Sequence, residues 1–438
     1  MSTDPSASFA LLYRRAGFGA SAAQIATLAG QPYSTTVDQL VTPLGGPDPG
    51  ADRVPPPQLS PPPSNYAQLK NDPTARQALA RTLAIQKVAL TNWWLGRMVA
   101  TTNPLQEKLT FLLHGHFPTA ISKVRFPIYM YGQNQLFRTK GSGDFDALTQ
   151  AVATDPAMLI WLDAASDIGS SPNENFAREL MERFTMGIGN YTEDDVRAGA
   201  ACFSGWRLNR VTSAFTIDAK QHNNSPQTFL GNQINSGQQA IDLATHSDAS
   251  AKFVPAALWS HLAYPVTTQD PVVADLSPGY AADRNVATLL RAIFQHPSFV
   301  SSASLTGLIK QPTEYVVGAL RALGVKATSL SSLPVQATLA GLGQVLFNPP
   351  SVGGWEQNEY WLSTAAALTR WDFAHRLATT ADISSVADQP AAGRVDATAA
   401  LLSLSGWSTT TAAALQQAAG NPETLVTLGL VSPEYVSN

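Results

Sequence analysis

The sequence predicts a mainly α-helical protein, a multi-helix globular bundle with a small β or irregular insertion near residues 206–235. Alanine- and leucine-rich helical patterns recur along most of the 438 residues. Hydrophobic residues make up 44% of the chain and charged residues only 14%, so a large core can form. The interval 206–235 differs because it mixes β-branched and polar residues with turn-forming asparagine, proline and glycine.

The N-terminal part of the chain predicts a separate arm. Short helical patterns lie at 9–15, 22–29 and 35–41. Two Pro-Pro-Pro runs then fall within 45–63, a segment that sustains neither helix nor sheet and is expected to be extended. We therefore predict three parts: a helical arm at 1–43, a proline-rich connector at 44–64, and a main helical domain at 65–438.

Start and stop signals divide the main domain into helices. Ser171 can cap a helix whose first turn holds Pro172 and Glu174. Acidic residues at 193–195 suit the positive end of the following helix, which Gly205 is expected to end. The predicted helices lie at 66–100 (one or two), 104–116, 125–139, 144–153, 156–163, 171–187, 192–204, 237–262, 281–295, 313–323, 334–346, 359–378 and 395–427.

Composition excludes several classes of protein. The 28 basic and 32 acidic residues give a net charge of −4 without a basic run, so we expect no nucleic-acid partner. No stretch of about 18 apolar residues occurs, so no membrane span is expected. Cys202 is the single cysteine, which excludes a disulfide or a four-cysteine metal site within one chain. The first residues lack the pattern of a signal peptide.

Common catalytic and cofactor motifs are also missing. No GxGxxG opens a βαβ unit, and neither GxxxxGK[ST] nor HExxH nor GxSxG occurs. We therefore expect no nucleotide cofactor.

A polar motif at 173–182 carries the main catalytic candidates. On a helix, Asn175, Arg178, Glu179 and Glu182 lie opposite an apolar arc. Glu179 and Glu182 are spaced i,i+3, with β-carbons about 5–6 Å apart, so they could act as acid and base or bind a divalent metal. The alternative is an ion network in which Arg178 pairs with Glu182 and Glu179 with Arg183.

Two histidines and two tryptophans complete the candidate site. His116 shares a helical stripe with Leu105 and Leu109 and is expected to face inward, whereas His114 points elsewhere. His116 is either a catalytic group or a hydrogen-bonded core residue. His222 lies in the irregular insertion, where binding residues are common. Trp206 and Trp355 could offer stacking platforms for a substrate such as a carbohydrate, or could serve packing alone.

The motifs together resemble a bacterial family, domain-of-unknown-function family eighteen hundred. The matching stretches are 14–19 (RRAGFG), 114–117 (HGHF), 155–159 (DPAML), 173–182 (NENFARELME), 191–196 (YTEDDV), 204–206 (SGW), 229–231 (FLG), 310–314 (KQPTE), 353–355 (GGW) and 432–435 (SPEY). The resemblance implies no defined reaction, although many relatives look exported and some are encoded beside sulfatase-like partners. This chain departs from the family at 222–227, where a His-Asp and a later glycine and lysine are usual.

Three functional hypotheses follow. The first is a hydrolase-type enzyme acting on a cell-envelope carbohydrate through Glu179 and Glu182, with Asp163 as a further candidate partner. The second is a non-catalytic scaffold or binding partner of an envelope-associated protein, with the polar motif as a structural ion network. The third is a metal-dependent enzyme in which His116, His222 and acidic residues bind a divalent ion, although no local ligand spacing indicates it.

Overall fold

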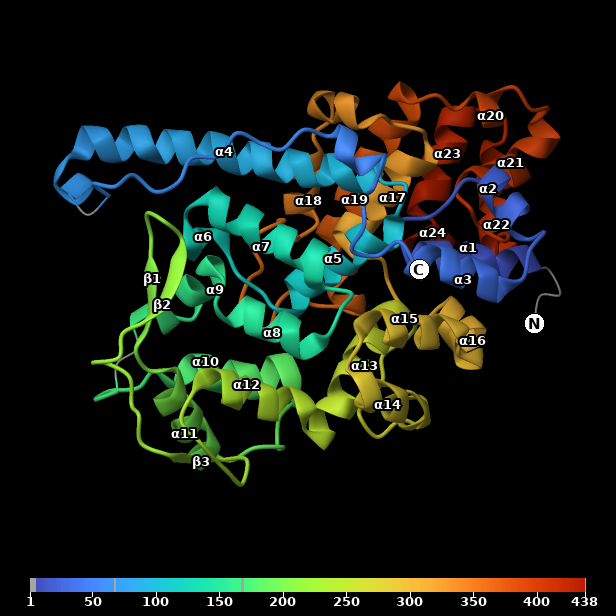
Figure 1. Cartoon of the computed structure of the whole chain (residues 1–438). Helices are drawn as coiled ribbons and strands as arrows, with labels where there is room; N and C mark the ends of the chain where they lie inside the picture. The colour runs from blue at the N-terminus through green and yellow to red at the C-terminus, as the bar shows by residue number, and fades with distance from the viewer. Residues whose placement is uncertain (1–4, 67, 167–168, 438) are drawn as a thin grey trace.

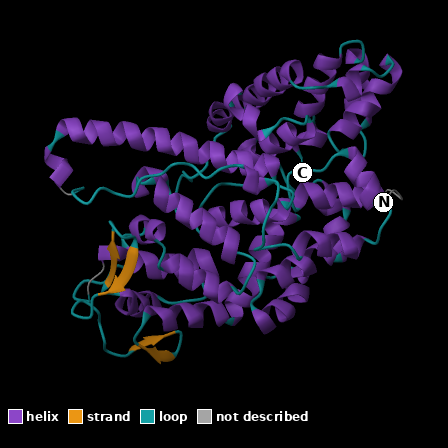
Figure 2. Cartoon of the chain, turned by 45° about the horizontal axis from the view of Figure 1, so that its top comes forward, coloured by secondary structure: helices purple, strands orange, loops and turns teal. Residues whose placement is uncertain are grey.

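The computed structural model describes residues 5–66, 68–166 and 169–437, and these residues form a mainly helical molecule, as the sequence predicts. Figure 2 shows helices throughout, with the strands confined to two small hairpins at one side of the molecule. None of the helices in the described ranges is long and apolar enough to cross a membrane.

The N-terminal segment contains α1 (Pro5–Arg15), α2 (Ala22–Leu28), α3 (Tyr33–Val41), the short 3-10 helices η1 (Ala51–Arg53) and η2 (Gln68–Asn71), and α4 (Pro73–Ala100). The long helix begins at residue 73 rather than at 66, because the Asp72 side chain accepts a hydrogen bond from the Ala75 amide and Pro73 occupies the first turn. Figure 1 shows that the N-terminal half of α4 projects from one edge of the molecule.

The central segment leads into the two hairpins. Its elements are α5 (Pro104–His116), α6 (Ile121–Val124), α7 (Pro127–Lys140), α8 (Phe145–Ala153), α9 (Pro156–Trp161), η3 (Ala164–Ser166), α10 (Glu174–Glu179), the π-helix η4 (Leu180–Thr185), α11 (Glu193–Phe203), β1 (Trp206–Asn209), β2 (Ala214–Ile217), β3 (Gln227–Phe229) and β4 (Asn232–Ile234). β1 pairs antiparallel with β2, and β3 with β4. Leu230 and Gly231 both have positive φ, which a tight two-residue hairpin turn between β3 and β4 requires.

The C-terminal half is again helical. It comprises α12 (Gly237–His246), α13 (Asp248–Leu262), α14 (Pro271–Asp283), α15 (Val286–Gln295), η5 (Pro297–Val300), α16 (Ser302–Leu305), α17 (Pro312–Ala322), η6 (Ala327–Ser332), α18 (Val335–Gly341), η7 (Asn358–Trp361), α19 (Thr364–Thr380), α20 (Ser384–Ala387), η8 (Ala391–Gly393), α21 (Arg394–Leu401), α22 (Thr409–Ala418), α23 (Pro422–Val431) and α24 (Pro433–Val436).

Capping residues divide some helices that the sequence pattern had joined. The expected helix at 237–262 is split because the Ser247 side chain accepts a hydrogen bond from the Ser250 amide and so starts α13. The expected helix at 395–427 is three helices, with Ser408 and Asn421 as the caps of α22 and α23. Periodicity alone misses these breaks, because the apolar pattern continues across them.

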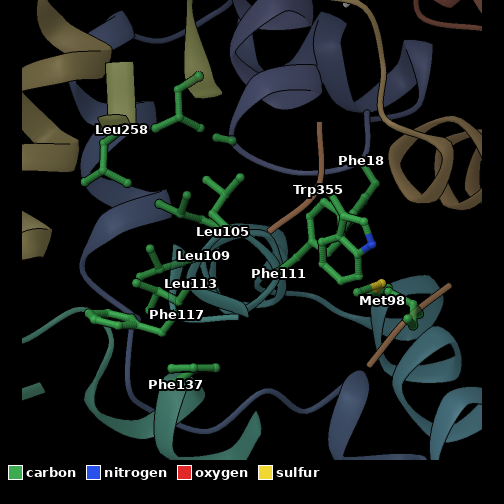
Figure 3. Packing of buried hydrophobic residues seen from close by; sticks show 14 of the residues in the cluster. Phe18, Met98, Leu105, Leu109, Phe111, Leu113, Phe117, Phe137, Leu258 and Trp355 are labelled. Atoms are coloured by element: carbon green, nitrogen blue, oxygen red, sulfur yellow. The ribbon is translucent and has the colours of Figure 1, made fainter. Parts of the chain in front are cut away.

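The core is built around α5, whose residues 104–114 are all buried. Figure 3 shows Leu105, Leu109 and Leu113 pointing toward one side of the helix and Phe111 toward Trp355 on the other. The rings of Phe111 and Trp355 stack with centroids 5.7 Å apart. A helix that is covered on every side lies at the centre of the molecule.

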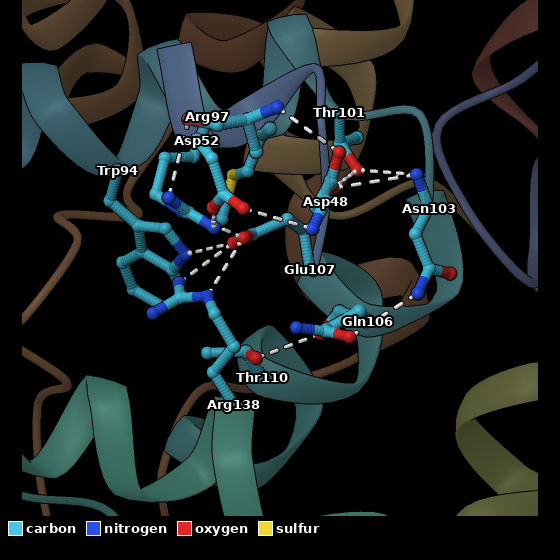
Figure 4. Close-up of polar contacts among 12 residues, drawn as sticks. Asp48, Asp52, Trp94, Arg97, Thr101, Asn103, Gln106, Glu107, Thr110 and Arg138 are labelled. Carbon is cyan, nitrogen blue, oxygen red and sulfur yellow. Dashed lines mark hydrogen bonds and ion pairs between the residues drawn. The ribbon is translucent and has the colours of Figure 1, made fainter. Parts of the chain in front are cut away.

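Glu107 of α5 is fully buried and is the centre of an ion network (Figure 4). Its carboxylate accepts hydrogen bonds from Arg97 Nε (3.0 Å), Arg138 Nε and Nη2 (2.8 and 2.9 Å) and Trp94 Nε1 (3.1 Å). Two guanidinium groups and one indole N–H thus satisfy both oxygens of this buried carboxylate. The network ties α4, α5 and α7 together.

The connector is fastened to the body through two aspartates. Asp48 is buried and accepts hydrogen bonds from the side chains of Thr101 and Thr102, and Asp52 pairs with Arg97 at 3.1 Å. α3 packs against α5 and α15, and Figure 1 shows α1–α3 beside the C-terminal helices. The division into an arm at 1–43, a connector at 44–64 and a domain at 65–438 stays a prediction.

Candidate functional site

The polar motif at 173–182 is not one regular helix. Asn173, rather than Ser171, caps α10, because its side chain accepts a hydrogen bond from the Asn175 amide at 3.0 Å. The helix then widens into the π-helix η4, in which the Thr185 hydroxyl donates to the Leu180 carbonyl at 2.6 Å. Such a widened turn changes the angular spacing of the side chains, and π-turns occur frequently at functional sites.

Arg178 does not form the ion pair that the sequence suggested. Its guanidinium donates to both carboxylate oxygens of Glu193 in α11, at 2.7 and 2.8 Å, and to Glu174 at 3.2 Å. The expected ion pair of Arg178 with Glu182 is therefore wrong, since Glu193 of the neighbouring helix binds the guanidinium in a bidentate arrangement. Arg178 thus joins α10 to α11, while Asn175 beside it is exposed.

Glu179 and Glu182 lie in different environments. Glu182 pairs with the adjacent Arg183 at 3.2 Å and accepts a hydrogen bond from the Tyr191 hydroxyl at 2.8 Å. The expected pair of Glu179 with Arg183 is absent among the described ion pairs, and Glu179 Oε2 is buried without a hydrogen-bond partner. Burial, with a smaller contribution from the charge of Glu182, raises the pKa of Glu179.

His116 contacts the end of the π-helix, as its ring Nε2 lies 2.8 Å from the Phe184 carbonyl oxygen. Burial lowers the pKa of His116 to about 4, so the ring is neutral at pH 7 and donates this hydrogen bond. His114 also faces the interior, contrary to the expectation that only His116 does, and its ring packs against Trp94 and Trp355. The helix is buried on every side up to residue 114, so His114 has no solvent-facing direction to take.

The remaining candidates are part of the packing. His222 lies with Nδ1 2.8 Å from the carbonyl oxygen of Ser204, at the end of α11, and with Nε2 3.0 Å from that of Asn235, so it joins the insertion to the end of α11. Trp206 is buried against Phe176 and Phe203, and Trp355 is buried near His114. The structure gathers His116 and the carboxylates near one π-helix, with His222 and Trp206 in the insertion and Trp355 in the α5 core.

One group of described residues has the arrangement of a possible metal site. Asp146, Asp242 and His246 each offer a ligand atom, all within 4.8 Å of one another. Neither His116 nor His222 belongs to this group. The expectation of a divalent metal stays a prediction.

A different site emerges where three distant motifs meet. A cavity of about 340 Å³ lies between the α1–α2 connection, the C-terminal end of α4, α17 and the last helix. Its lining includes Arg14 and Gly19 of the 14–19 motif, Lys310 and Glu314 of the 310–314 motif, and Tyr435 of the 432–435 motif. A volume of roughly 300–1,000 Å³ is typical of sites for small molecules.

Three cations on this lining have main-chain carbonyl oxygens as partners instead of carboxylates. Arg14 Nη1 donates to Ser403 O at 2.9 Å, Lys310 Nζ donates to Tyr435 O, and Arg321 Nη1 donates to Val99 O at 2.8 Å. Within the described ranges, none of the three forms an ion pair. We call Arg14, Lys310 and Arg321, with the cavity that they line, the cationic cavity.

Two more cations lie behind the cationic cavity. Arg15 donates to the Ser304 carbonyl, and Lys108, which is fully buried, pairs with Glu314. Burial lowers the pKa of Arg14 to about 10 and that of Arg15 to about 9, and the charge of Arg14 lowers the latter further. Burial also lowers the pKa of Arg321, and the charge of Asp48 opposes this shift. Glu314, the one described carboxylate that lines the cavity, is thus already paired with Lys108, while Arg14, Lys310 and Arg321 have carbonyl partners.

The floor of the cavity carries an unpartnered hydroxyl. Tyr435 is almost fully buried, and its Oη has no hydrogen-bond partner among the described residues. Gly318 allows this packing, because a β-carbon there would lie 3.1 Å from Tyr435 Oη. At the rim, Ser21 and Gln24 are exposed, so the cavity reaches solvent.

The sequence contained these three motifs without indicating a site. Residues 14, 310 and 435 are separated by most of the chain, and periodicity does not show which of them meet. The one available signal was the pair of adjacent arginines in the RRAGFG stretch, which stands among apolar residues. Charged residues are rarely buried unless paired, so two arginines in an apolar segment indicate a nearby partner or ligand.

The chain belongs to the family described as "Protein of unknown function (DUF1800)", whose model matches residues 11–437. The resemblance seen in the motifs is thereby confirmed over nearly the whole chain. No curated protein and no solved structure matches it.

Proposed function

We propose that the protein binds a small anionic ligand, a carboxylate or a phosphate, in the cationic cavity. The observation that carries this proposal is that Arg14, Lys310 and Arg321 line a cavity of ligand size and have only carbonyl partners there, while Glu314, the one described carboxylate of the lining, is paired with Lys108. Burying an unpaired charge is costly, and the cost falls when an opposite charge is bound nearby. An anion beside Arg14, Lys310 and Arg321 would supply that charge.

The geometry suits an anion in two further respects. Arginine presents a planar fork that matches both carboxylate and phosphate oxygens, and Arg14 Nε has no partner among the described residues. The Tyr435 hydroxyl, also unpartnered, can donate to a ligand oxygen.

The test is binding of inorganic phosphate and of sulfate at constant ionic strength, by calorimetry and by thermal unfolding. Bound anion at about a hundred times Kd should stabilise the protein by about 2.7 kcal/mol. Arg14→Gln should weaken binding by at least about tenfold, the equivalent of one charge-assisted hydrogen bond. Arg81→Gln, at an exposed arginine of α4, is the matched control and should bind as the parent does. Equal binding by both variants would refute the proposal.

A second candidate function is the hydrolysis of a cell-envelope carbohydrate by Glu179 and Glu182. The observation that favours it is the contrast between their surroundings: burial favours the protonated acid at Glu179, whereas Glu182 has Arg183 and Tyr191 as partners. Carboxyl groups whose environments differ in this way supply the acid and the base of many hydrolases. Arg178 would then position the pair through α11.

Release of reducing sugar from an isolated bacterial cell-envelope polysaccharide tests this second function. Glu179→Gln should abolish the release, and Glu356→Gln, at an exposed glutamate, should not. If wild-type protein releases nothing while Glu179→Gln destabilises the fold, the motif is structural. That result would favour the alternative of a scaffold that binds an envelope-associated protein.

A further inference from the structure

We propose that Lys310 is a nucleophilic amine that forms an imine with an aldehyde or ketone whose anionic group binds at Arg14 and Arg321. This inference rests on the proposed anion site and adds a covalent step to it. The ligand class is a small carbonyl compound with a carboxylate or phosphate, such as a 2-oxo acid.

The two buried lysines of this region differ in their partners. Lys108 is fully buried and pairs directly with Glu314. Lys310 is also buried, yet its one side-chain hydrogen bond within the described ranges goes to the Tyr435 carbonyl oxygen. Glu314 lies one helical turn beyond Lys310 but is engaged by Lys108 and by the Gln311 amide, at 2.9 Å. Lys310 is therefore left without a carboxylate.

The charges that face Lys310 favour the free amine. Arg14, Arg15 and Lys108 repel an ammonium group there, while Glu314 attracts it from a greater distance than it attracts Lys108. The Tyr435 ring, whose centroid lies 3.6 Å from Nζ, also favours the ammonium form. Burial and the neighbouring cations outweigh both, and the pKa of Lys310 is well below its usual value.

A lysine in a desolvated site beside other cations is activated as a nucleophile, because its lone pair is free at neutral pH. Lys310 lines the same cavity as Arg14 and Arg321, so a bound anion would bring its carbonyl carbon to the amine. Nζ adds to that carbon to give a carbinolamine. Loss of the hydroxyl as water, with one proton from nitrogen, gives the imine, and no oxidant or reductant is needed.

The experiment uses the full chain with glyoxylate as the anionic aldehyde, and cyanoborohydride to fix the imine as a stable amine. Peptide mapping then compares the extent of labelling at Lys310 with that at Lys108 and at five exposed lysines: Lys123, Lys140, Lys220, Lys252 and Lys326. We expect Lys310 to be labelled at least about tenfold more than any exposed lysine, since each unit of pKa lowering raises the free-amine fraction about tenfold. Lys108 should stay unlabelled.

Two comparisons test the anionic part of the ligand. Inorganic phosphate should protect Lys310 but not Lys252. Acetaldehyde, which has no charge, should show a smaller preference for Lys310 over Lys252 than glyoxylate shows, because only the lowered pKa then favours Lys310. Lys310→Met should lose the selective label, and Lys326→Met should keep it. If Lys310→Met does not fold, the site mapping of the wild-type protein still decides the result.

The outcomes separate the two proposals. Uniform labelling of the exposed lysines, together with phosphate binding that depends on Arg14, overturns the imine and leaves the anion site standing. Absence of both phosphate binding and Lys310 labelling overturns both. Strong Lys310 labelling that phosphate does not reduce overturns the anionic ligand class.

Discussion

Replacing Glu107 with glutamine should be one of the most destabilising isosteric changes in the protein. The variant keeps the shape of the side chain but removes the charge that two buried guanidinium groups share (Figure 4). It also places an amide NH₂ group where Arg97 or Arg138 donates, so at least one of three charge-assisted hydrogen bonds is lost and a donor faces a donor.

The magnitude follows from these contacts. Breaking a buried ion pair by removing one partner costs about 3–5 kcal/mol, because an uncompensated charge remains. Unfolding entropy is about 2.1 cal/mol/K per residue, so for a chain of this length we expect a fall in Tm of about 3–5 °C if the chain unfolds cooperatively.

The assay is urea unfolding followed by circular dichroism, with calorimetry for Tm. Glu356→Gln is the matched control, because Glu356 is exposed and has no described partner, and its change should stay within about 0.5 kcal/mol. A Glu107→Gln variant that unfolds like this control would show that the network contributes no net stability, and the reasoning from burial would be wrong.

Three further predictions concern the candidate site and the insertion. Arg178→Gln should lower the free energy of unfolding by less than about 1 kcal/mol in urea titrations, because its partners Glu174 and Glu193 are partly exposed; a loss near 3 kcal/mol would contradict this. Burial lowers the pKa of His116 to about 4 from 6.5, so the unfolded state binds the extra proton between these values and stability falls as pH drops from 6.5 toward 4. His116→Gln should reduce that fall by about 1–3 kcal/mol relative to wild type and to the exposed-site control His375→Gln. If the free energy of unfolding of wild type and of His116→Gln changes in parallel with pH, His116 is not the group responsible. Gly205→Ala should destabilise the protein by more than about 1 kcal/mol in the same titration, since φ is +80° and the new β-carbon would lie 2.7 Å from the Asp218 carbonyl oxygen; a neutral result would show that the insertion shifts freely.

The individual helices were largely predictable because their signals are local. Pro104, Pro156 and Pro312 each occupy the first turn of the helix that the pattern predicted there. α14 was missed, since Pro278 within it reads as a helix breaker. The π-helix was missed as well, because an extra residue in one turn leaves no mark in apolar periodicity.

The candidate site was less predictable than the fold. Local spacing suggested that Arg178 pairs with Glu182. The partner is instead Glu193, eleven residues further along the chain, because α11 packs against α10. The burial of His114 followed from the position of α5 at the centre, which depends on every helix around it.

The sequence by itself determined the helical class, the place of the β insertion and the family, because caps, turns and periodicity act over a few residues. Tertiary structure alone decided that Arg14, Lys310 and Tyr435 share one cavity and that Lys108, rather than Lys310, has Glu314 as its partner. The physical reason is that charge and burial depend on distance in space, and residues that meet across hundreds of positions leave no local pattern.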